Sequence, residues 1–397
     1  TISINGNHFQ GQYKFNSNIL CIMKNVFDKI MFVLLSLILF SCSQDDAVMN
    51  DHIVGTNESE SEFLTLNSGV QVEKKGDNYI FGGDIILSDE QLNNLNETGS
   101  IVGKVTEPLA RDLSVNPLTN MPLNISKLIS TRNLGVHPTA YNLWAMVRFT
   151  YDSNLNSKQK ACIKAALLDL QSKTNVRFYN STGQSQHDNV YNIDYPYVNF
   201  IYKKGDTSES KIGRVGGRQD IELADFAFDY ASYLGDYGII EHEICHALGM
   251  MHEQQRPDRD DYVTINWNNL TSKGRSNFSK VTTNYMYRGS YDYNSLMGYS
   301  SETSSKSMVN DTSAAMYTKK DGSLITQGKT VSDQDRMWIN YLYLPYVARS
   351  DTYRELDKVV YDGNNKRLTE QERLQLQAQL NNGNPNPPAN GRIENNF

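Results

Sequence analysis

The chain contains the run His242-Glu243-Ile244-Cys245-His246-Ala247-Leu248-Gly249-Met250-Met251-His252, which has the pattern HExxHxxGxxH. On an α-helix, His242 and His246 lie on one face about one turn apart, so both can offer a ring nitrogen to one metal ion. Gly249 can adopt the left-handed conformation that ends a helix, and the turned chain can then bring His252 back as a third ligand.

Three neutral imidazoles with one open coordination position are typical of a catalytic zinc site, whereas structural zinc sites usually have four protein ligands. Glu243 is displaced around the helix from His242, so it can reach a water at the metal without binding the metal itself. Ordinary surface histidines are the simpler interpretation of a short HExxH pattern. Three of the seven histidines of the chain stand in register with this glutamate and glycine, which favours a single catalytic zinc ion.

Two further motifs follow the zinc-binding pattern. Residues 253–263 read EQQRPDRDDYV, and residues 295–299 read SLMGY. The glycine turn followed by a methionine turn is typical of the metzincin clan. The Glu after the third His, the R-x-D-R-D segment and the S-x-M-x-Y turn together resemble the astacin family of zinc endopeptidases. Gly298 differs from many relatives, which have His at this position.

The resemblance implies a role for each of four residues. Glu243 would be the general base that activates the water and passes its proton to the leaving amine. Tyr299 would be a further zinc ligand in the resting enzyme and would then stabilise the oxyanion. Met297 would lie beneath the three imidazoles, and Glu253 would receive the new N-terminus of the activated enzyme. Without the preceding motif, a single Met or Tyr at such positions is more often an ordinary packed residue.

The predicted fold class is α+β: an astacin-like catalytic domain with two long helices, a twisted and mainly antiparallel sheet, and a zinc cleft between N- and C-terminal subdomains. Apolar periodicity predicts helices over residues 157–172, 237–248 with Asp236 as the cap, and 333–344. Short β-rich runs predict strands over residues 176–179, 197–202 and 211–215. Residues 213–219 are expected near the edge strand that pairs with an extended substrate.

An inhibitory segment is predicted upstream of the catalytic domain. Phe81-Gly82-Gly83-Asp84-Ile85 resembles the F-x-G-D element of astacin prosegments, in which the Asp binds the catalytic zinc and keeps the zymogen inactive. A plain glycine turn after a short strand over residues 78–81 is the alternative. A lock through the thiolate of Cys42 ranks lower, because a lipidated sulfur could not bind the metal.

The N-terminal region is typical of an exported bacterial protein. Residues 31–40 form an apolar run interrupted by Ser36 and preceded by Lys24 and Lys29, too short to span a bilayer but suited to a signal-peptide core. The run ends in a sequence that resembles a lipoprotein signal, with Cys42 as the acylated residue. Ordinary secretory cleavage is the alternative interpretation.

These features divide the chain into five regions. They are a possibly untranslated leader (1–22), a signal peptide (23–42), a tether and prosegment (43–135), the catalytic domain (136–347) and a polar, partly disordered, linker-like tail (348–397). The tail includes a short helix over residues 368–380. The mature domain is expected to begin between Ser130 and Tyr141, with Arg132 as a trypsin-like cleavage point for an unidentified protease. Because the anchor lies on the prosegment, cleavage would release the catalytic domain from the lipid.

Cysteine content and charge add two expectations. Cys162 and Cys245 lie on the two predicted long helices and could approach each other, so a disulfide is the alternative to the favoured expectation of free, buried thiols. Asn175 stands where relatives often have Cys. The net charge of −7 gives no basic surface suited to nucleic acid. The resemblance implies protein or peptide substrates as partners, and Cys42 would add an attachment to a membrane.

The sequence thus predicts a secreted zinc endopeptidase made as a zymogen. One alternative is a catalytically silent zinc-binding surface lipoprotein that acts as an adhesin or binding module. The presence of both Glu243 and Tyr299 argues against that alternative. A zinc hydrolase acting on a non-peptide bond would use the same ligands.

Overall fold

The computed structural model describes residues 61–101, 115–116, 121–122, 135–136, 146–188, 193–205, 207–213, 215, 217–282, 285–286, 289–347, 353, 355–390 and 392. The predicted signal peptide, Cys42 and Arg132 lie outside the described residues. The described residues all belong to the compact unit Ser41–Phe397. Among them, no helix combines the length and the apolar character needed to cross a membrane.

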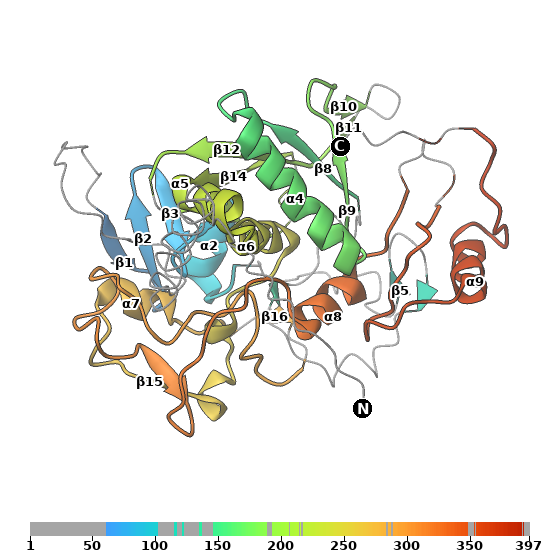
Figure 1. Ribbon diagram of the computed structural model, residues 1–397. Coiled ribbons are helices and arrows are strands. Elements are labelled where there is room, and N and C mark those ends of the chain that lie inside the picture. The colour runs from blue at the N-terminus through green and yellow to red at the C-terminus, as the bar shows by residue number, and fades with distance from the viewer. Residues whose placement is uncertain are drawn as a thin grey trace, which may run out of the picture. The chain divides into compact units, whose positions relative to one another are not determined.

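A mixed sheet of nine strands organises the described residues (Figure 1). Its strands, in spatial order, are β1 (Glu62–Thr65), β2 (Gln71–Lys75), β3 (Asn78–Phe81), β4 (Ile85–Ile86), β13 (Glu209–Lys211), β14 (Arg218–Ala224), β12 (Tyr197–Lys203), β8 (Met146–Tyr151) and β9 (Arg177–Asn180). The first four strands come from the segment of residues 61–101, called the N-terminal segment below. This segment therefore continues the sheet of the predicted catalytic domain.

The predicted α+β class is confirmed, but the sheet of the catalytic domain is not mainly antiparallel. Strands β14, β12, β8 and β9 pair in parallel, and only β13 runs antiparallel to its neighbour β14. For β8 and β9 the cause is the helix α4 (Ser157–Lys173), which connects the two strands. A strand, a crossover helix and a neighbouring strand give a parallel pair. Strand β8 was not predicted, so this β-α-β unit was not recognisable.

The remaining elements surround this sheet. The further helices are α2 (Asp89–Thr98), α5 (Asp225–Asp229), the π-helix η1 (Tyr230–Leu234), α6 (Gly238–Leu248), α7 (Ser272–Asn277), α8 (Asp333–Leu342) and α9 (Glu370–Leu380), with 3-10 turns at Glu253–Gln255 and Arg259–Asp261. The two-stranded pairs are β5 (Val115–Asn116) with β6 (Met121–Pro122), β7 (Gly135–Val136) with β16 (Tyr285–Met286), β10 (His187–Asp188) with β11 (Ile193–Asp194), and β15 (Val263–Ile265) with β17 (Tyr317–Lys319).

The predicted helices are present within one or two residues at most ends, and the strand predicted over residues 211–215 is displaced. Strand β13 is the outermost strand of the sheet when the N-terminal segment is left out, so residues 213–219 follow it and reach into the interior strand β14. The α6 helix starts where the amide of Gly238 donates to Oδ1 of Asp236, at 3.0 Å. It ends at Gly249, whose φ of 110° is left-handed, as expected.

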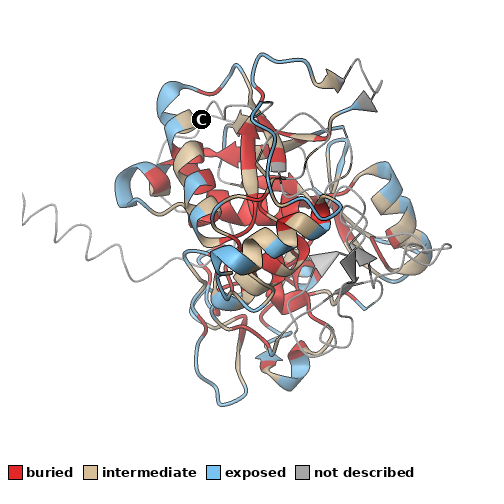
Figure 2. Ribbon diagram, turned by 90° about the vertical axis from the view of Figure 1, so that its right-hand side faces the viewer, coloured by how far each residue is buried: buried red, intermediate tan, exposed pale blue. Residues whose placement is uncertain are grey.

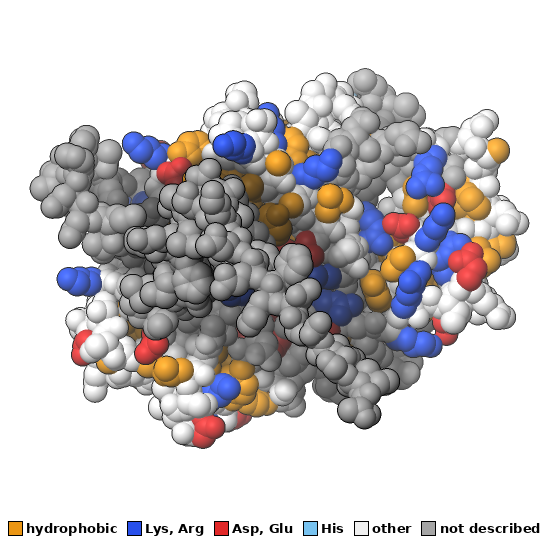
Figure 3. Space-filling model, viewed as in Figure 1, with side chains coloured by type: hydrophobic (Ala, Val, Ile, Leu, Met, Phe, Trp, Pro, Cys, Tyr) orange, Lys and Arg blue, Asp and Glu red, His pale blue; other side chains and the backbone are white. Residues whose placement is uncertain are grey.

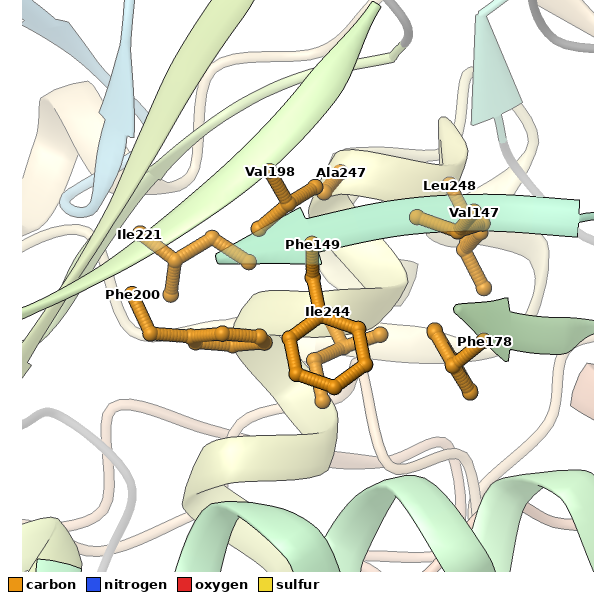
Figure 4. Close-up of a pocket in the computed structure, with 9 residues that line it drawn as sticks. All are labelled: Val147, Phe149, Phe178, Val198, Phe200, Ile221, Ile244, Ala247 and Leu248. Carbon is orange, nitrogen blue, oxygen red and sulfur yellow. The ribbon is translucent and has the colours of Figure 1, made fainter. Parts of the chain in front are cut away.

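The main core lies between the sheet and the helices α4, α6 and α8. Figure 2 shows buried residues concentrated at the centre of the described structure. A cavity of about 10 Å³ remains between the strands and α6, where Ile244 of that helix lies beside Phe149 and Leu248 lies beside Val147 (Figure 4). Because its lining is entirely apolar, a water molecule would find no hydrogen-bond partner there.

The C-terminal tail contains the helix expected over residues 368–380, as α9, and also a small apolar cluster that was not predicted. Its described residues form α9 and a small apolar cluster of Leu356, Val360 and Leu380, which packs against Leu344 and Tyr346. On its outer side, basic and acidic side chains are interspersed and form pairs such as Arg373 with Glu370 (Figure 3). A polar composition suggested a linker because only three side chains form the core of this segment.

Buried polar contacts attach this segment to the start of β9. The side chain of Asn175 is fully buried, donates to the carbonyl of Tyr361 at 2.7 Å and accepts from the amide of the same residue at 2.8 Å. Nearby, Nε of Arg177 donates to Asp357 at 2.7 Å. The position at which relatives often have Cys is therefore used here for a non-covalent link.

We predict that Asn175→Ala lowers the free energy of unfolding by about 1–3 kcal/mol, because it leaves buried main-chain groups of Tyr361 without partners. Denaturant unfolding measures this change. Asn364→Ala, at an exposed position in the same segment, serves as the control and should change stability by less than about 0.5 kcal/mol. Equal effects of the two substitutions would contradict the proposed link.

Candidate metal centre

Helix α6 and the chain after it bring the three predicted histidines together. His242 and His246 lie one turn apart on α6, and the left-handed Gly249 reverses the chain so that His252 returns to them. All three side chains are fully buried. Nε2 of His242 lies 3.2 Å from Nε2 of His252. The spacing argument therefore predicted the arrangement of these rings correctly.

A fourth residue, Asp84, enters the same site from the N-terminal segment. Its Oδ2 lies 3.2 Å from Nε2 of His252 and 3.5 Å from Nε2 of His242, and its Oδ1 lies 3.4 Å from Nε2 of His246. The four ligand atoms lie within 4.8 Å of one another. The glycine turn that was the alternative interpretation is present too, but it delivers Asp84 to the histidines.

The outer nitrogens of two rings fix their tautomers. Nδ1 of His242 donates to the carbonyl of Leu296 at 3.0 Å, and Nδ1 of His246 donates to the carbonyl of Met250 at 2.7 Å. Because a carbonyl oxygen only accepts hydrogen bonds, each Nδ1 carries the proton and each Nε2 presents a lone pair. Such an orienting hydrogen bond on the outer nitrogen is usual for metal-binding histidines.

The charge state of the site suits a divalent cation. Burial lowers the pKa of His246 to about 4, so the imidazole is neutral. Asp84 is buried as well, and its two carboxylate oxygens face the Nε2 atoms of the three rings. Oδ1 of Asp84 and Nε2 of His246 are buried and have no hydrogen-bond partner among the described residues. Converging acceptors without a donor fit a metal ion, and three nitrogens with one carboxylate oxygen are a ligand set that zinc accepts.

The methionine turn supports two of the ligands through its main chain. The carbonyl of Leu296 orients His242, and the carbonyl of Met297 accepts from the amide of Glu253, next to His252, at 3.0 Å. Met297 itself is buried in the main core. The structure thus places the turn beside the imidazoles.

Asp335, on α8, was not identified from the sequence. It accepts from the hydroxyl of Ser295 at 2.8 Å and from the amide of Leu296 at 2.9 Å, so two hydrogen bonds attach the methionine turn to α8. Burial, followed by the charge of Asp292, raises the pKa of Asp335 to about 6. The sequence signal was the capping pattern that starts at Ser332, which predicts a helix start but not a second role for its carboxylate.

Tyr299 lies next to His252, with ring centroids 5.0 Å apart. Its hydroxyl donates to the carbonyl of Gly82 at 2.9 Å. A Cβ atom at Gly83 would lie 2.8 Å from this hydroxyl and 2.6 Å from Nδ2 of Asn277, and the φ of Gly83 is 111°. The N-terminal segment can therefore approach Tyr299 this closely only with glycine at this position. In this structure the phenol contacts the N-terminal segment, and its binding to zinc in the resting enzyme stays a prediction.

Glu253 is already paired inside the protein. Its Oε1 accepts from Nη1 of Arg256 at 2.9 Å and from the amide of Asp292 at 2.8 Å. Burial raises the pKa of Glu253 to about 8 despite the opposing charge of Arg256. Arg256 also binds both oxygens of Asp258, so the R-x-D-R-D segment forms a buried ion-pair network beside the third histidine. The predicted contact of Glu253 with a new N-terminus concerns a cleaved form and stays a prediction.

The last two predicted features are on α6 itself. Glu243 is fully buried and directly follows the ligand His242. Cys245 and Cys162 are free and buried, as predicted. Burial raises the pKa of Cys245 well above its usual value, and Cys245 is not among the clustered residues that could hold a metal ion.

Comparisons with known proteins place these observations in a family. The family model for Astacin, a family of peptidases, matches residues 136–344. High choriolytic enzyme 2 of Oryzias latipes is 34% identical over 160 residues, which cover 40% of this chain and 50% of that protein. Flavastacin of Elizabethkingia meningoseptica is 32% identical over 185 residues, covering 46% and 36% of the two chains. The chain thus spans about half the length, or less, of these relatives.

Among solved structures, that of high choriolytic enzyme 1, a hatching enzyme zinc-protease from Oryzias latipes, is similar to this chain. It has 28% sequence identity and a TM-score of 0.41, over 52% of this chain and 92% of the other. The region matched by the family model contains the three histidines, Glu243 and Tyr299. Asp84 and the segment around α9 lie outside it.

We predict that the intact chain binds about one zinc ion and that His252→Ala lowers its zinc affinity by at least about tenfold, because one of three imidazole ligands is lost. Competition with a chromogenic chelator measures the affinity. His187→Ala is the matched control, because His187 lies on the surface and pairs with Asp194, away from the site. Zinc affinity unchanged by His252→Ala would show that the ion binds elsewhere.

Proposed function

The chain belongs to the astacin family of peptidases, and from this premise we propose that it is a zinc-dependent endopeptidase that hydrolyses peptide bonds in proteins. The observation that carries the proposal is the cluster of three fully buried histidines on and after α6, with Glu243 directly beside the first ligand. This arrangement contains the base and the metal ligands needed for hydrolysis of an amide bond.

Each residue of the site has its own role in the proposed reaction. Zinc, when bound by His242, His246 and His252, supplies Lewis-acid polarisation of the scissile carbonyl. Glu243 takes a proton from the attacking water and then delivers it to the leaving amine. Tyr299 donates a hydrogen bond to the oxygen on which negative charge develops. The chain keeps both residues, Glu243 next to a ligand in the sequence and Tyr299 beside the ring of His252, which does not favour a catalytically silent binding module.

A contact within the structure supports the role given to Tyr299. Its hydroxyl already donates to a peptide carbonyl oxygen, that of Gly82, two residues before Asp84. We take this carbonyl as a stand-in for the substrate carbonyl that Tyr299 would meet in the active enzyme. The phenol is therefore positioned to bind a peptide oxygen next to the metal ligands.

The edge strand β13 is the proposed binding strand for the substrate main chain. In this structure β4 occupies it, with Ser210 opposite Ile85, and the amide of Ser210 donates to the carbonyl of Asp84 at 3.0 Å. An extended substrate could use the same main-chain groups once β4 is removed. The proposed binding strand, Glu209–Lys211, thus precedes in the chain the residues 213–219 that the sequence indicated.

We further propose that the N-terminal segment is an inhibitory prosegment, so that the chain is a zymogen. Asp84 occupies the position that water and substrate would need, and Tyr299 is engaged by Gly82. The segment is fastened by Lys75 to Glu209 at 3.3 Å and by the side chain of Gln91 to the carbonyl of Ile212 at 3.1 Å. Removal of this segment would open the metal to substrate.

Export and lipid anchoring complete the proposal. The support is the signal-like sequence of residues 23–42, with Cys42 as the acylated residue. Cleavage after the prosegment would then release the active domain from the membrane. Mass analysis of membrane and soluble fractions tests this, and active protein that keeps Cys42 and His242 in one membrane-bound polypeptide would contradict it.

We predict that processed protein hydrolyses casein and that a chelator abolishes the activity. Glu243→Ala should lower the rate by at least about a hundredfold, because general acid–base catalysis contributes about 10²–10⁴. Zinc content should stay at about one ion per chain, since Glu243 is not a ligand. Processed wild-type protein that cuts no protein substrate would contradict the peptidase assignment.

We predict that Asp84→Ala raises the peptidase activity of the uncleaved chain at least about tenfold, equivalent to about 1.4 kcal/mol, because the carboxylate no longer competes with water and substrate. The assay uses a fluorogenic peptide and a cleavage-resistant intact chain. Asp77→Ala, at the exposed turn between β2 and β3, is the control and should leave the activity low. Equal activity of the two variants would argue against a zymogen held by Asp84.

A further inference from the structure

Apolar side chains flank Asp84 on both sides in the N-terminal segment. Phe81, Ile85 and Leu87 are buried, with exposed fractions of 1%, 0% and 7%. They belong to one apolar cluster with three residues of the family-matched region, Ile212, Met251 and Val281. Met251 precedes the ligand His252 in the chain.

The three cluster residues from the family-matched region lie close in the chain, or by a main-chain hydrogen bond, to residues in or near the metal centre. Ile212 precedes Gly213, whose amide donates to the carbonyl of His246 at 2.8 Å. The amide of Val281 donates to the carbonyl of Gln255 at 2.8 Å, and a Cβ atom at Gly82 would lie 2.7 Å from the side chain of that glutamine. Ile212, Met251 and Val281, called the apolar subsite below, therefore lie alongside the path that the inhibitory segment takes past the histidines.

Removal of the N-terminal segment would expose the apolar subsite. Its side chains have exposed fractions of 1%, 2% and 7% while that segment is present. A contiguous apolar patch that becomes exposed beside a reactive site is typically a binding surface. Glu209 on strand β13 would lose Lys75 with the N-terminal segment, but it would keep its ion pair with Lys203, at 2.8 Å. This carboxylate therefore does not favour a charged side chain in the substrate.

On the basis of the proposed function, we infer that the apolar subsite selects substrates with a bulky aliphatic or aromatic side chain close to the scissile bond. The chain's own inhibitory segment indicates which kind of side chain binds there. Phe81 and Ile85, the side chains on either side of the Gly82-Gly83-Asp84 turn, are apolar and belong to the same cluster as the apolar subsite. The activated enzyme would offer the same surface to Leu, Ile, Val, Met or Phe of a protein substrate. The buried area of one such side chain corresponds to on the order of a ten- to hundredfold preference.

Two measurements test the inference on protein processed from the intact chain. The first is a peptide library with sequencing of the products. We expect Leu, Ile, Val, Met and Phe to be enriched at least about tenfold over Asp, Glu and Lys at one position within about three residues of the cut. Ile212→Lys should abolish this enrichment, and Val281→Glu provides a second variant should the first fail to fold. Leu324→Lys, at an exposed position, is the control.

The second measurement uses a synthetic peptide of residues 78–87 as an inhibitor. Replacing Phe81 or Ile85 by Ala in this peptide should weaken inhibition by about tenfold, whereas Ala at Asn78 should have little effect. Equal inhibition by all these peptides, or cleavage without an apolar preference, would overturn the inference while leaving the peptidase assignment intact. Failure of the processed protein to cut any library peptide would overturn both.

Discussion

The hydrogen bonds from two imidazole rings to main-chain carbonyls impose the constraint on which the site depends. His242 can present its Nε2 lone pair only while the carbonyl of Leu296 holds its Nδ1 proton, and Met250 does the same for His246. The carboxylate of Asp84 adds further acceptors to the same buried space. A cation is needed to satisfy such a set of acceptors, because Asp84 Oδ1 and His246 Nε2 meet no donor from the described part of the chain.

Several parts of the fold maintain this constraint. Asp335 holds the methionine turn, the turn carries the carbonyl of Leu296, and α6 ends at a left-handed glycine so that Met250 and His252 return to the site. The methionine turn therefore acts through its main chain as well as through Met297. A substitution of Asp335 would therefore disturb the orientation of His242 through Leu296.

The edge strand β13 links inhibition and the proposed substrate binding. An open edge with free main-chain groups pairs readily with another extended segment. Here β4 covers that edge and Asp84 lies at the histidines, while Phe81 and Ile85 belong to the same apolar cluster as the apolar subsite. We propose that the main-chain groups of β13 and the apolar subsite bind the prosegment first and the substrate after its removal.

The sequence predicted those features that depend on local spacing. The three histidines, Glu243 and the glycine turn lie within eleven residues, so helix geometry and the turn at Gly249 arrange them together. Asp84 was found because its glycines and aspartate form a recognisable motif. The strand directions were predicted wrongly, because strand pairing depends on partners far apart in the chain. Asp335 and the contact of Asn175 with Tyr361 were missed for the same reason, since each joins elements separated by 39 or more residues.

The central claim is that Asp84 shares the metal site with the three histidines in the intact chain. A crystal structure of the zinc-loaded, uncleaved protein, with anomalous data at the zinc edge, tests it most directly. Our account predicts a zinc peak bonded to Nε2 of His242, His246 and His252 and to a carboxylate oxygen of Asp84. A peak bonded to the three histidines and a water, with Asp84 turned away, would contradict it.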